Sequence, residues 1–286
     1  MKISEFFKQK QPVVSFEIFP PKPDAPFEPI LTTIRELEDL GPDFISVTYG
    51  AAGTTQGRTI EIAENIKKRN NSQTESLAHL TCITNSPEEI EQMLLHIQSR
   101  GIRNILALRG DPPVDKSVHT NKIFAKDLVE QIKKIGGFCI GAAAYPEGHP
   151  ECPDREKEFN YLKDKINAGV DFLITQIFFD NTFFYDLQEK LYKSDINTPM
   201  CAGIMPVFAK SQIERICSLC GSSITSEIQA MMDKYGHNAS DMQKAGLEYA
   251  VKQIDDLRQN GARGIHLYTM NKPDLAKAMV KDTGLH

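Results

Sequence analysis

One repeating unit, an amphipathic helix followed by a glycine and a short apolar strand, runs along most of this sequence and limits its fold more than any other feature. Residues 90–97 place four apolar side chains on one helical face, Gly101 follows, and residues 105–108 form an apolar run. Ser86 and Glu89 have the spacing of a capping box at the start of this helix. The same unit recurs around Gly41, Gly169 and Gly261. A glycine at this place suits the left-handed conformation that closes the last turn of a helix.

Eight apolar segments have the character of strands, and each is followed by at least one helical pattern. They lie at residues 13–19, 44–48, 77–83, 105–108, 138–144, 172–175, 200–205 and 265–268. Strands that alternate with helices form right-handed crossovers and a parallel sheet. Eight such units favour the α/β class and a closed (β/α)8 (TIM) barrel over an open sheet. Helical patterns at residues 224–232 and 239–259 predict one extra helix before the last strand.

The length of 286 residues would suit two domains of average size. However, no linker or low-complexity run divides the chain, and α/β barrels reach this size as one domain. We therefore expect a single barrel domain over residues 1–286.

The composition is ordinary for a globular chain, with 41% hydrophobic and 25% charged residues. The 33 Lys and Arg residues against 38 Asp and Glu residues give a net charge of −5, which disfavours nucleic-acid binding through phosphate contacts. The apolar stretches are too short to span a bilayer, and residues 1–12 lack the apolar core of a signal peptide. We expect a cytoplasmic protein that binds neither nucleic acid nor membranes.

The six cysteines are scattered through apolar segments, as is typical of reduced, buried thiols. Cys217 and Cys220 have the spacing of half a zinc site, but no second pair completes it, and we expect no metal. The sequence also lacks the GxGxxG, GxxxxGK[ST], HExxH and GxSxG motifs. These absences argue against a separate dinucleotide-binding domain and against the metalloprotease and serine-hydrolase classes.

In a (β/α)8 barrel, functional side chains lie at the carboxyl ends of the strands and in the loops that follow. Glu17 lies inside the otherwise apolar first strand, where desolvation would raise its pKa and make it a candidate general acid. A solvated or ion-paired glutamate is the alternative. Arg109 and Asp111 follow the fourth strand and suit an anion or a polar ring, or an ion pair with each other.

Polar side chains also mark other strand ends. His79 in the third strand fits either a structural hydrogen-bonder or a catalyst. After the fifth strand, Tyr145 offers a stacking face and His149 a hydrogen bond. Gln176 after the sixth strand can present a donor and an acceptor to an amide-like ring edge, or can serve a turn. Lys272 places a cation near the rim.

Taken together, these strand-end segments resemble the methylenetetrahydrofolate reductase family, flavin-dependent barrel enzymes of one-carbon metabolism. The matching segments, in the order of the family, are Ser15-Phe-Glu-Ile-Phe-Pro-Pro21, Val47-Thr-Tyr-Gly-Ala51, His79-Leu-Thr-Cys82, Leu108-Arg-Gly-Asp111, Ala143-Ala-Tyr-Pro-Glu147, His149-Pro150, Thr175-Gln176, Phe178-Phe179 and Tyr268-Thr-Met-Asn271.

The resemblance implies FAD as the cofactor, with 5,10-methylenetetrahydrofolate and a reduced nicotinamide as substrates. In this family the nicotinamide gives a hydride to FAD and leaves. The folate then binds the same face of the flavin and is reduced to 5-methyltetrahydrofolate, which supplies methyl groups for methionine synthesis. This ping-pong scheme agrees with the missing dinucleotide-binding motif. We also expect a homo-oligomer, and the electron donor, NADH, NADPH or a redox partner subunit, is left open.

Residue roles follow from the same resemblance. Glu17 would be the general acid that helps to open the five-membered ring of the folate. Asp111 would bind the pterin and act on the flavin through its charge, and Gln176 would contact folate and nicotinamide in turn. The residues implied to line FAD are Thr48, Tyr49, Ala51, His79, Arg109, Gly110, Asp111, Ala125, Tyr145, His149 and Lys165, with Lys165 approaching the diphosphate.

Four positions depart from the family pattern. Tyr161 and Asp164 stand where better-known bacterial members present Asn and Arg to the cofactor, and Phe124 replaces a tyrosine before Ala125. Lys272, implied to bind the substrate, stands where an arginine often contacts the folate tail. A lysine cannot reproduce the bidentate fork of an arginine.

Two other functions compete with a flavin-dependent folate reductase. One is a folate- or flavin-binding subunit that works only inside a larger redox complex. The other is an unrelated barrel lyase or aldolase, which would need a Schiff-base lysine or metal ligands at the strand ends. The sequence offers no convincing set of those residues.

Overall fold

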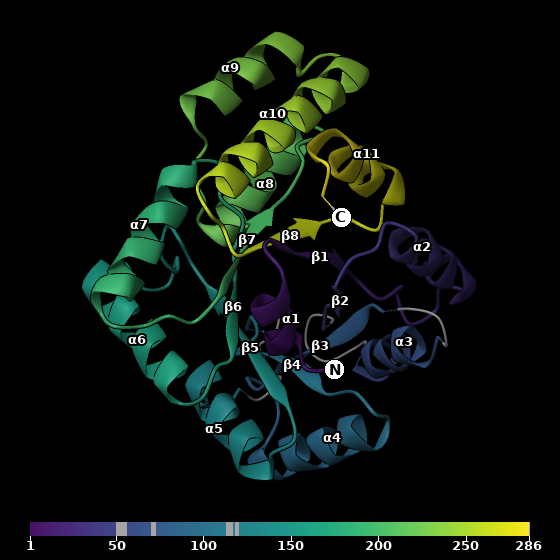
Figure 1. The fold of residues 1–286 in the computed structure, drawn as a ribbon, viewed down its shortest axis with the longest axis vertical. Helices are drawn as coiled ribbons and strands as arrows, with labels where there is room; N and C mark the ends of the chain where they lie inside the picture. Colours follow the sequence, from purple (N-terminus) through teal and green to yellow (C-terminus); the bar gives the residue numbers. More distant parts are fainter. Residues whose placement is uncertain (50–55, 70–72, 113–116, 118–119, 286) are drawn as a thin grey trace.

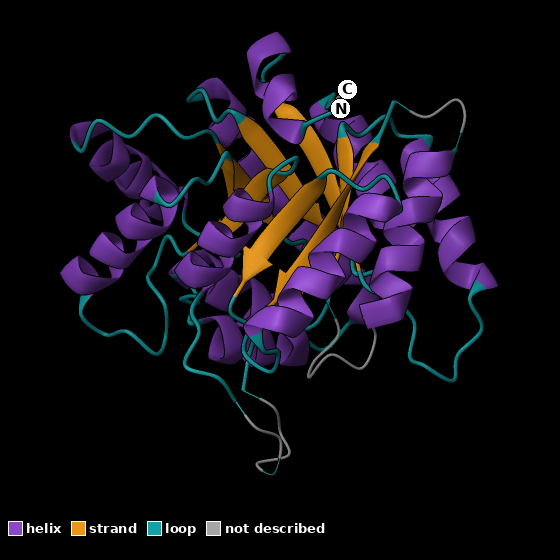
Figure 2. Cartoon of the chain, turned by 90° about the horizontal axis from the view of Figure 1, so that it is seen from below, coloured by secondary structure: helices purple, strands orange, loops and turns teal. Residues whose placement is uncertain are grey.

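The computed structural model describes residues 1–49, 56–69, 73–112, 117 and 120–285. Eight parallel strands close into a barrel in chain order, which confirms the predicted α/β barrel. The strands are β1 (Val13–Ile18), β2 (Phe44–Val47), β3 (Glu75–Thr81), β4 (Asn104–Leu108), β5 (Cys139–Ala144), β6 (Phe172–Thr175), β7 (Met200–Ile204) and β8 (Gly264–Tyr268). Figure 2 shows them enclosed by helices.

Helices surround the barrel because each carries one apolar stripe that packs on the strands. They are α2 (Glu28–Glu38), α3 (Gln56–Lys68), α4 (Pro87–Ser99), α5 (Ala125–Ile135), α6 (Arg155–Asn167), α7 (Asn181–Lys193) and α11 (Pro273–Thr283). The capping box at the start of α4 forms as predicted, since Ser86 Oγ accepts from the Glu89 amide and the Glu89 carboxylate accepts from the Ser86 amide. Gly101 after α4 has a φ of 77°, in the left-handed region.

Helix α1 (Ile3–Gln9) closes the end of the barrel at which the strands begin, and Figure 1 shows it lying over the ring of strands. Ile3, Phe6 and Phe7 pack into a buried cluster with inward-facing strand residues that include Phe44 and Phe172. The rings of Phe7 and Phe172 lie 5.9 Å apart between centroids. A ligand therefore has to approach the barrel interior from the end at which the strands finish, which we call the mouth.

Three helices lie between β7 and β8: α8 (Lys210–Cys220), α9 (Ser226–Tyr235) and α10 (Ala239–Gln259). The extra helix that the sequence predicts is therefore present, and α8 adds another that includes Cys217 and Cys220. Figure 1 shows α9 and α10 projecting from one side of the barrel. They enclose their own apolar cluster, made of Ile177, Phe179, Met205, Val207, Ile213, Cys217, Ile228, Met231, Met232 and Met242. This cluster ties the three helices to the segments that follow β6 and β7.

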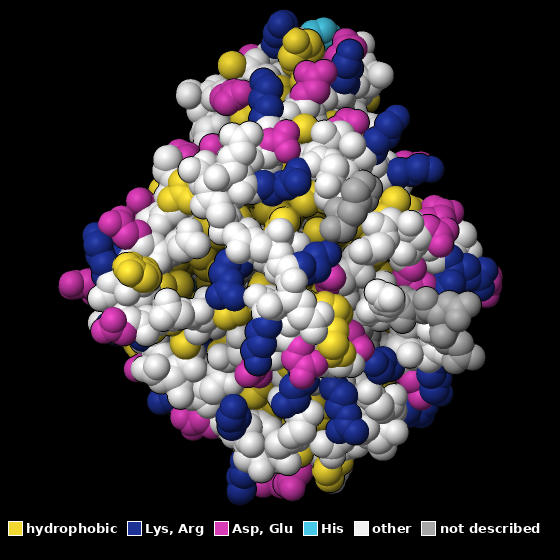
Figure 3. Space-filling view, in the orientation of Figure 1, with side chains coloured by type: hydrophobic (Ala, Val, Ile, Leu, Met, Phe, Trp, Pro, Cys, Tyr) yellow, Lys and Arg dark blue, Asp and Glu magenta, His cyan; other side chains and the backbone are white. Residues whose placement is uncertain are grey.

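The surface carries charges of both signs. On the face shown in Figure 3, Lys and Arg side chains are interspersed with Asp and Glu side chains. All six cysteines are free thiols, and Cys82, Cys139, Cys201 and Cys217 are buried. Among the residues that the structure describes, no helix has the length and apolar character needed to cross a bilayer.

Candidate active site

Glu17 lies near the carboxyl end of β1, where its register partners are Ser46 on β2 and Tyr268 on β8. Its side chain is 19% exposed. The Oε2 atom is 3.4 Å from the Ser46 hydroxyl, 3.5 Å from Nε2 of His266 and 3.6 Å from Nε2 of His79. One carboxylate oxygen is thus surrounded by polar groups from β2, β3 and β8. Because these strands are distant in sequence, only the closed barrel assembles this cluster.

The two imidazoles change the protonation of Glu17. Burial is the largest single contribution and raises the pKa of the carboxyl, but His266, His79 and Ser46 together outweigh it and hold the pKa below its usual value. Desolvation therefore acts in the expected direction, but the net pKa of Glu17 is lowered and not raised, opposite to the expectation for a candidate general acid. The reason is that the strand places the carboxylate between two ring nitrogens and a hydroxyl instead of among apolar side chains.

His79 and His266 differ in their own environments. Burial lowers the pKa of His79 to about 4, although Glu17 opposes the shift, so this imidazole is neutral at pH 7. Within the described residues, Nε2 of His79 makes no hydrogen bond. His266 is fully buried, and its Nδ1 lies 2.8 Å from the Ser15 hydroxyl on the neighbouring strand. Ser15 therefore fixes the orientation of the ring that faces Glu17.

Arg109 at the end of β4 pairs with Glu151 and not with Asp111, the partner that the sequence suggested as an alternative. The guanidinium makes a two-pronged contact with the Glu151 carboxylate, at 2.5 and 3.0 Å. Such paired hydrogen bonds hold both groups in one plane. Asp111 is exposed beside them at the mouth.

The loop after β5 adds an aromatic pair. The rings of Tyr145 and His149 meet edge to face, with centroids 4.6 Å apart. Nδ1 of His149 accepts a hydrogen bond from the Glu151 amide, which fixes the ring tautomer with the proton on Nε2 when it is neutral. Burial lowers the pKa of His149 and raises that of Tyr145 to about 12. Both rings are therefore uncharged at neutral pH.

Lys165 on α6 reaches back to the end of β5, where its Nζ donates to the Ala143 carbonyl at 2.6 Å. Burial lowers the pKa of this amine to about 8, and Glu158 offsets only part of the shift. An anion bound nearby would stabilise such a part-buried ammonium, whose hydrogen bond to Ala143 is with a neutral acceptor.

Other predicted residues also lie at or near the mouth. Thr48 and Tyr49 follow β2, and the Tyr49 hydroxyl contacts the Met93 sulfur at 3.6 Å. Gln176 follows β6, and its Oε1 accepts from the Ile177 amide at 2.8 Å. Ala125 is the first residue of α5, and Gly110 follows Arg109. Ala51 lies outside the described residues.

Comparison with known proteins decides the family. Residues 2–284 match the methylenetetrahydrofolate reductase family. The chain belongs to this family. Proteins named 5,10-methylenetetrahydrofolate reductase from Pectobacterium carotovorum and Escherichia coli are 33% and 32% identical to it, over 95% and 97% of this chain and 90% and 92% of their own lengths.

A plant member, methylenetetrahydrofolate reductase (NADH) 1 of Arabidopsis thaliana, is 35% identical over 99% of this chain, which spans 50% of the plant protein. Among solved structures, a Clostridium thermocellum protein described as binding two copies of 5-methyl-5,6,7,8-tetrahydrofolic acid has a TM-score of 0.69 at 15% identity. The match covers 98% of this chain and 96% of the other. At that identity the likeness supports the fold alone. The family to which this chain belongs is one of oxidoreductases.

The four positions expected from the sequence to depart from the family pattern are exposed. Phe124 is 60% exposed and Tyr161 is 55% exposed, and Asp164 is exposed on the same helix as Tyr161. The ammonium of Lys272 lies 4.7 Å from the centroid of the Phe208 ring. Lys272 is therefore held over the loop after β7, at the edge of the mouth.

Sequence reasoning missed several residues that contact Glu17, His266 or Arg109 in the folded barrel. Ser15 and Ser46 are small polar residues in apolar strands and gave little signal. His266 was detectable, because a histidine between Ile265 and Leu267 is as unusual in a buried strand as Glu17 is. Glu151 stands at the end of the loop that holds His149, but nothing in the sequence pairs it with Arg109.

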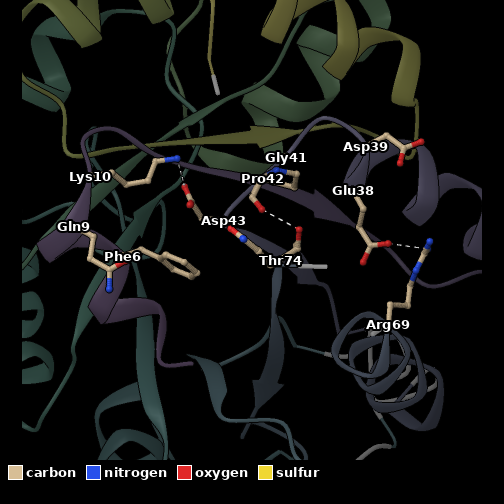
Figure 4. A pocket seen from close by; sticks show the side chains of 11 residues that line it. Phe6, Gln9, Lys10, Glu38, Asp39, Gly41, Pro42, Asp43, Arg69 and Thr74 are labelled. Atoms are coloured by element: carbon tan, nitrogen blue, oxygen red, sulfur yellow. Dashed lines mark hydrogen bonds and ion pairs between the residues drawn. The ribbon is translucent and has the colours of Figure 1, made fainter. Parts of the chain in front are cut away.

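The end of the barrel opposite the mouth contains a different kind of space. A cavity of about 790 Å³ lies there, and Figure 4 shows its lining, which includes the ion pairs Lys10–Asp43 and Arg69–Glu38. Four of its charged side chains form these two ion pairs. Among the described residues, no group of three or more His, Cys, Asp and Glu side chains could hold a metal ion.

Proposed function

We propose that this chain reduces 5,10-methylenetetrahydrofolate to 5-methyltetrahydrofolate, with FAD as its cofactor and a reduced nicotinamide as electron donor. The observation that carries the proposal is the Glu17 carboxylate at the mouth, with His79, His266 and Ser46 within 3.6 Å of one oxygen. A family member that retains this acid at the carboxyl end of β1 has the group needed for proton transfer to a bound folate.

Three features of the mouth fit a flavin cofactor. Lys165 offers a part-buried ammonium whose pKa is already lowered, so a diphosphate beside it would stabilise the charged form. Tyr145 and His149 present an uncharged aromatic pair on the neighbouring loop. The buried Nε2 of His79 lies 3.6 Å from Glu17 and, among the described residues, makes no hydrogen bond. FAD, when bound, supplies the capacity to accept a hydride from the nicotinamide and to deliver it to the folate.

Glu17 would hold the proton that the folate needs when its five-membered ring opens. A flat substrate lying over the mouth would remove the remaining exposure of this side chain, and the lost hydration would raise its pKa from the lowered value of the open site. Substrate binding would then favour the protonated form of Glu17, which the folate step requires. His266, held by Ser15, would keep Oε2 in place throughout.

Three further residues would bind the substrates. Asp111, exposed at the mouth, would accept hydrogen bonds from the pterin and place a negative charge near the flavin. Gln176 would use its carboxamide nitrogen toward each substrate in turn, because its Oε1 is engaged by the Ile177 amide. Lys272 would contact the folate tail as a point charge. We also propose that the barrel over residues 1–286 acts as one catalytic domain, in a cytoplasmic homo-oligomer.

An absorbance experiment tests the proposed function. Purified protein is mixed with FAD, freed of unbound cofactor and treated without oxygen first with NADH or NADPH and then with 5,10-methylenetetrahydrofolate. We expect the flavin absorbance to bleach with one of the nicotinamides and to return with the folate, as 5-methyltetrahydrofolate forms. Protein that retains no FAD, or reduced flavin that the folate leaves unchanged, would contradict the proposal.

The same experiment separates the isolated enzyme from a subunit of a redox complex. In the second case neither nicotinamide would bleach the bound flavin. Flavin reduced chemically would still be reoxidised by the folate, and a partner would have to supply the electrons.

A further inference from the structure

The motif Tyr268-Thr-Met-Asn271 contains two polar residues, Thr269 and Asn271, to which the proposed reaction gives no role. They follow β8 directly. Backbone pairing between β1 and β8 runs in register from Val13 and Gly264 to Glu17 and Tyr268, and it ends there. Beyond this point, contacts between the end of β1 and the segment after β8 must therefore involve side chains.

Thr269 and Asn271 provide these contacts at Glu17 itself and at Phe19, two residues further along the chain. The Thr269 hydroxyl donates to the Glu17 carbonyl at 2.7 Å. The Asn271 carboxamide binds both backbone groups of Phe19, since its Oδ1 accepts from the Phe19 amide at 3.0 Å and its Nδ2 donates to the Phe19 carbonyl at 2.9 Å. One amide side chain thus replaces the missing strand and continues the pairing past the proposed acid.

The rest of this chain segment has few other ways to be held. Pro20 and Pro21 follow Phe19 and have no N–H group to donate. On the β2 side, the Thr48 amide reaches the Ile18 carbonyl at 3.0 Å. The end of β1 is therefore fixed on one side by β2 and on the other by Asn271 and Thr269.

The backbone of this turn is costly, which argues that its geometry matters. Met270 and Asn271 both have a φ of 54°, in the left-handed region that residues other than glycine rarely adopt. Asparagine is among the few that tolerate it, and such strain persists where the surroundings fix it and where a site depends on it. The turn is closed by a hydrogen bond from the Lys272 amide to the Thr269 carbonyl at 2.9 Å.

We infer that Asn271 is a positioning residue that, with Thr269, holds the carboxyl end of β1 and so places the Glu17 carboxylate for proton transfer to the folate. This inference rests on the proposed function, because it assigns Glu17 to the folate step. Asn271 would act through the main chain of residues 17–19, and the inference requires no contact between Asn271 and the substrate.

The test compares variants that separate the contact from the backbone strain. Asn271→Gly keeps the left-handed turn at no steric cost and removes only the carboxamide. Asp195→Gly is its matched control, because Asp195 is also left-handed, with a φ of 58°, but lies in the exposed turn between α7 and β7 at the opposite end of the barrel. Thr269→Val removes the hydroxyl and Thr269→Ser restores it.

We expect Asn271→Gly and Thr269→Val to slow reoxidation of reduced flavin by 5,10-methylenetetrahydrofolate by about tenfold or more, since small displacements of reacting groups have effects of this size. Reduction of the flavin by the nicotinamide should change by less than about twofold, because no proton from Glu17 is needed there. Thr269→Ser and Asp195→Gly should behave as wild type. Equal loss in both half-reactions, or no loss in either, would overturn the inference.

Hydrogen–deuterium exchange on protein without added cofactor gives a readout that does not depend on activity. Exchange at the Phe19 amide should be faster in Asn271→Gly than in wild type and in Asp195→Gly. Unchanged exchange would overturn the contact itself. If the wild-type protein lacks the folate half-reaction, the proposed function fails, while this measurement still tests whether Asn271 holds the end of β1.

Discussion

At the scale of single residues, the protonation of Glu17 illustrates what a sequence can and cannot show. A carboxyl group inside an apolar strand marked the position correctly, because such a residue is unusual unless it is paired or functional. The direction of its pKa depends on His79 and His266, which lie 62 and 249 residues away along the chain. No local pattern reports that proximity, and burial alone led to the opposite expectation.

The neutral state of His79 has a measurable consequence for stability. The pKa of His79 is about 4 in the folded protein, against about 6.5 in an unfolded chain. Between these pH values the unfolded state binds the extra proton, so the free energy of unfolding falls as the pH falls. Between pH 6.5 and pH 5 this one residue should account for a loss of about 1.5 kcal/mol.

The measurement is the free energy of unfolding from urea titrations of cofactor-free protein at several pH values. His79→Asn should lose less stability than wild type over this range, because its side chain has no proton to gain. The lowered pKa of Glu17 adds a loss mainly below about pH 4.5, and His149, whose pKa is also lowered, contributes to both proteins and cancels in the comparison. Parallel curves for wild type and variant would show that His79 is not buried as a neutral ring.

At the scale of elements, the strands were predicted to within a few residues because parallel barrel strands are buried on both faces and read as continuous apolar runs. The helix starts were equally legible where a capping box marked them, as at Ser86. The segment between β7 and β8 was harder. Helix α8 contributes Ile213 and Cys217 to the apolar cluster that it shares with α9, α10 and the segments after β6 and β7, so its apolar residues do not form a stripe against the barrel alone, and the sequence did not predict it as a separate helix.

Packing of α10 depends on a glycine that the sequence did not mark. A Cβ atom on Gly246 would lie 1.9 Å from the Val207 carbonyl oxygen, a main-chain atom in the segment after β7. We predict that Gly246→Ala lowers the free energy of unfolding by about 1–3 kcal/mol, since the backbone has to move apart.

Thermal and urea unfolding of Gly246→Ala and of Gly57→Ala provide the comparison. Gly57 lies in α3, and a Cβ there would meet nothing within 4 Å. Its replacement should therefore be neutral or raise the free energy of unfolding by a few tenths of a kcal/mol to about 1 kcal/mol. Equal effects of the two substitutions would mean that α10 does not approach the β7–α8 segment as closely as the structure has it.

At the scale of the whole molecule, closure of the barrel turns eight separate strand ends into one site. The sequence predicted this arrangement because a count of eight strand–helix units leads to a known architecture with a known functional end. It could not supply the partners across the mouth, such as Glu151 for Arg109 or Asn271 for Phe19. Those contacts depend on loop conformation, which carries no periodic signal.

The most direct test of the account is the effect of Glu17→Gln on the two half-reactions of the FAD-loaded protein. Glutamine keeps the size of the side chain but has no acidic proton to give. We predict that flavin reduction by the nicotinamide continues, whereas reoxidation by 5,10-methylenetetrahydrofolate falls by at least about 100-fold, the range typical of a lost general acid. Glu91→Gln, an exposed change on α4, should leave both steps unaltered. A near-normal rate of reoxidation by the folate in Glu17→Gln would contradict the central claim that this carboxyl is the proton donor.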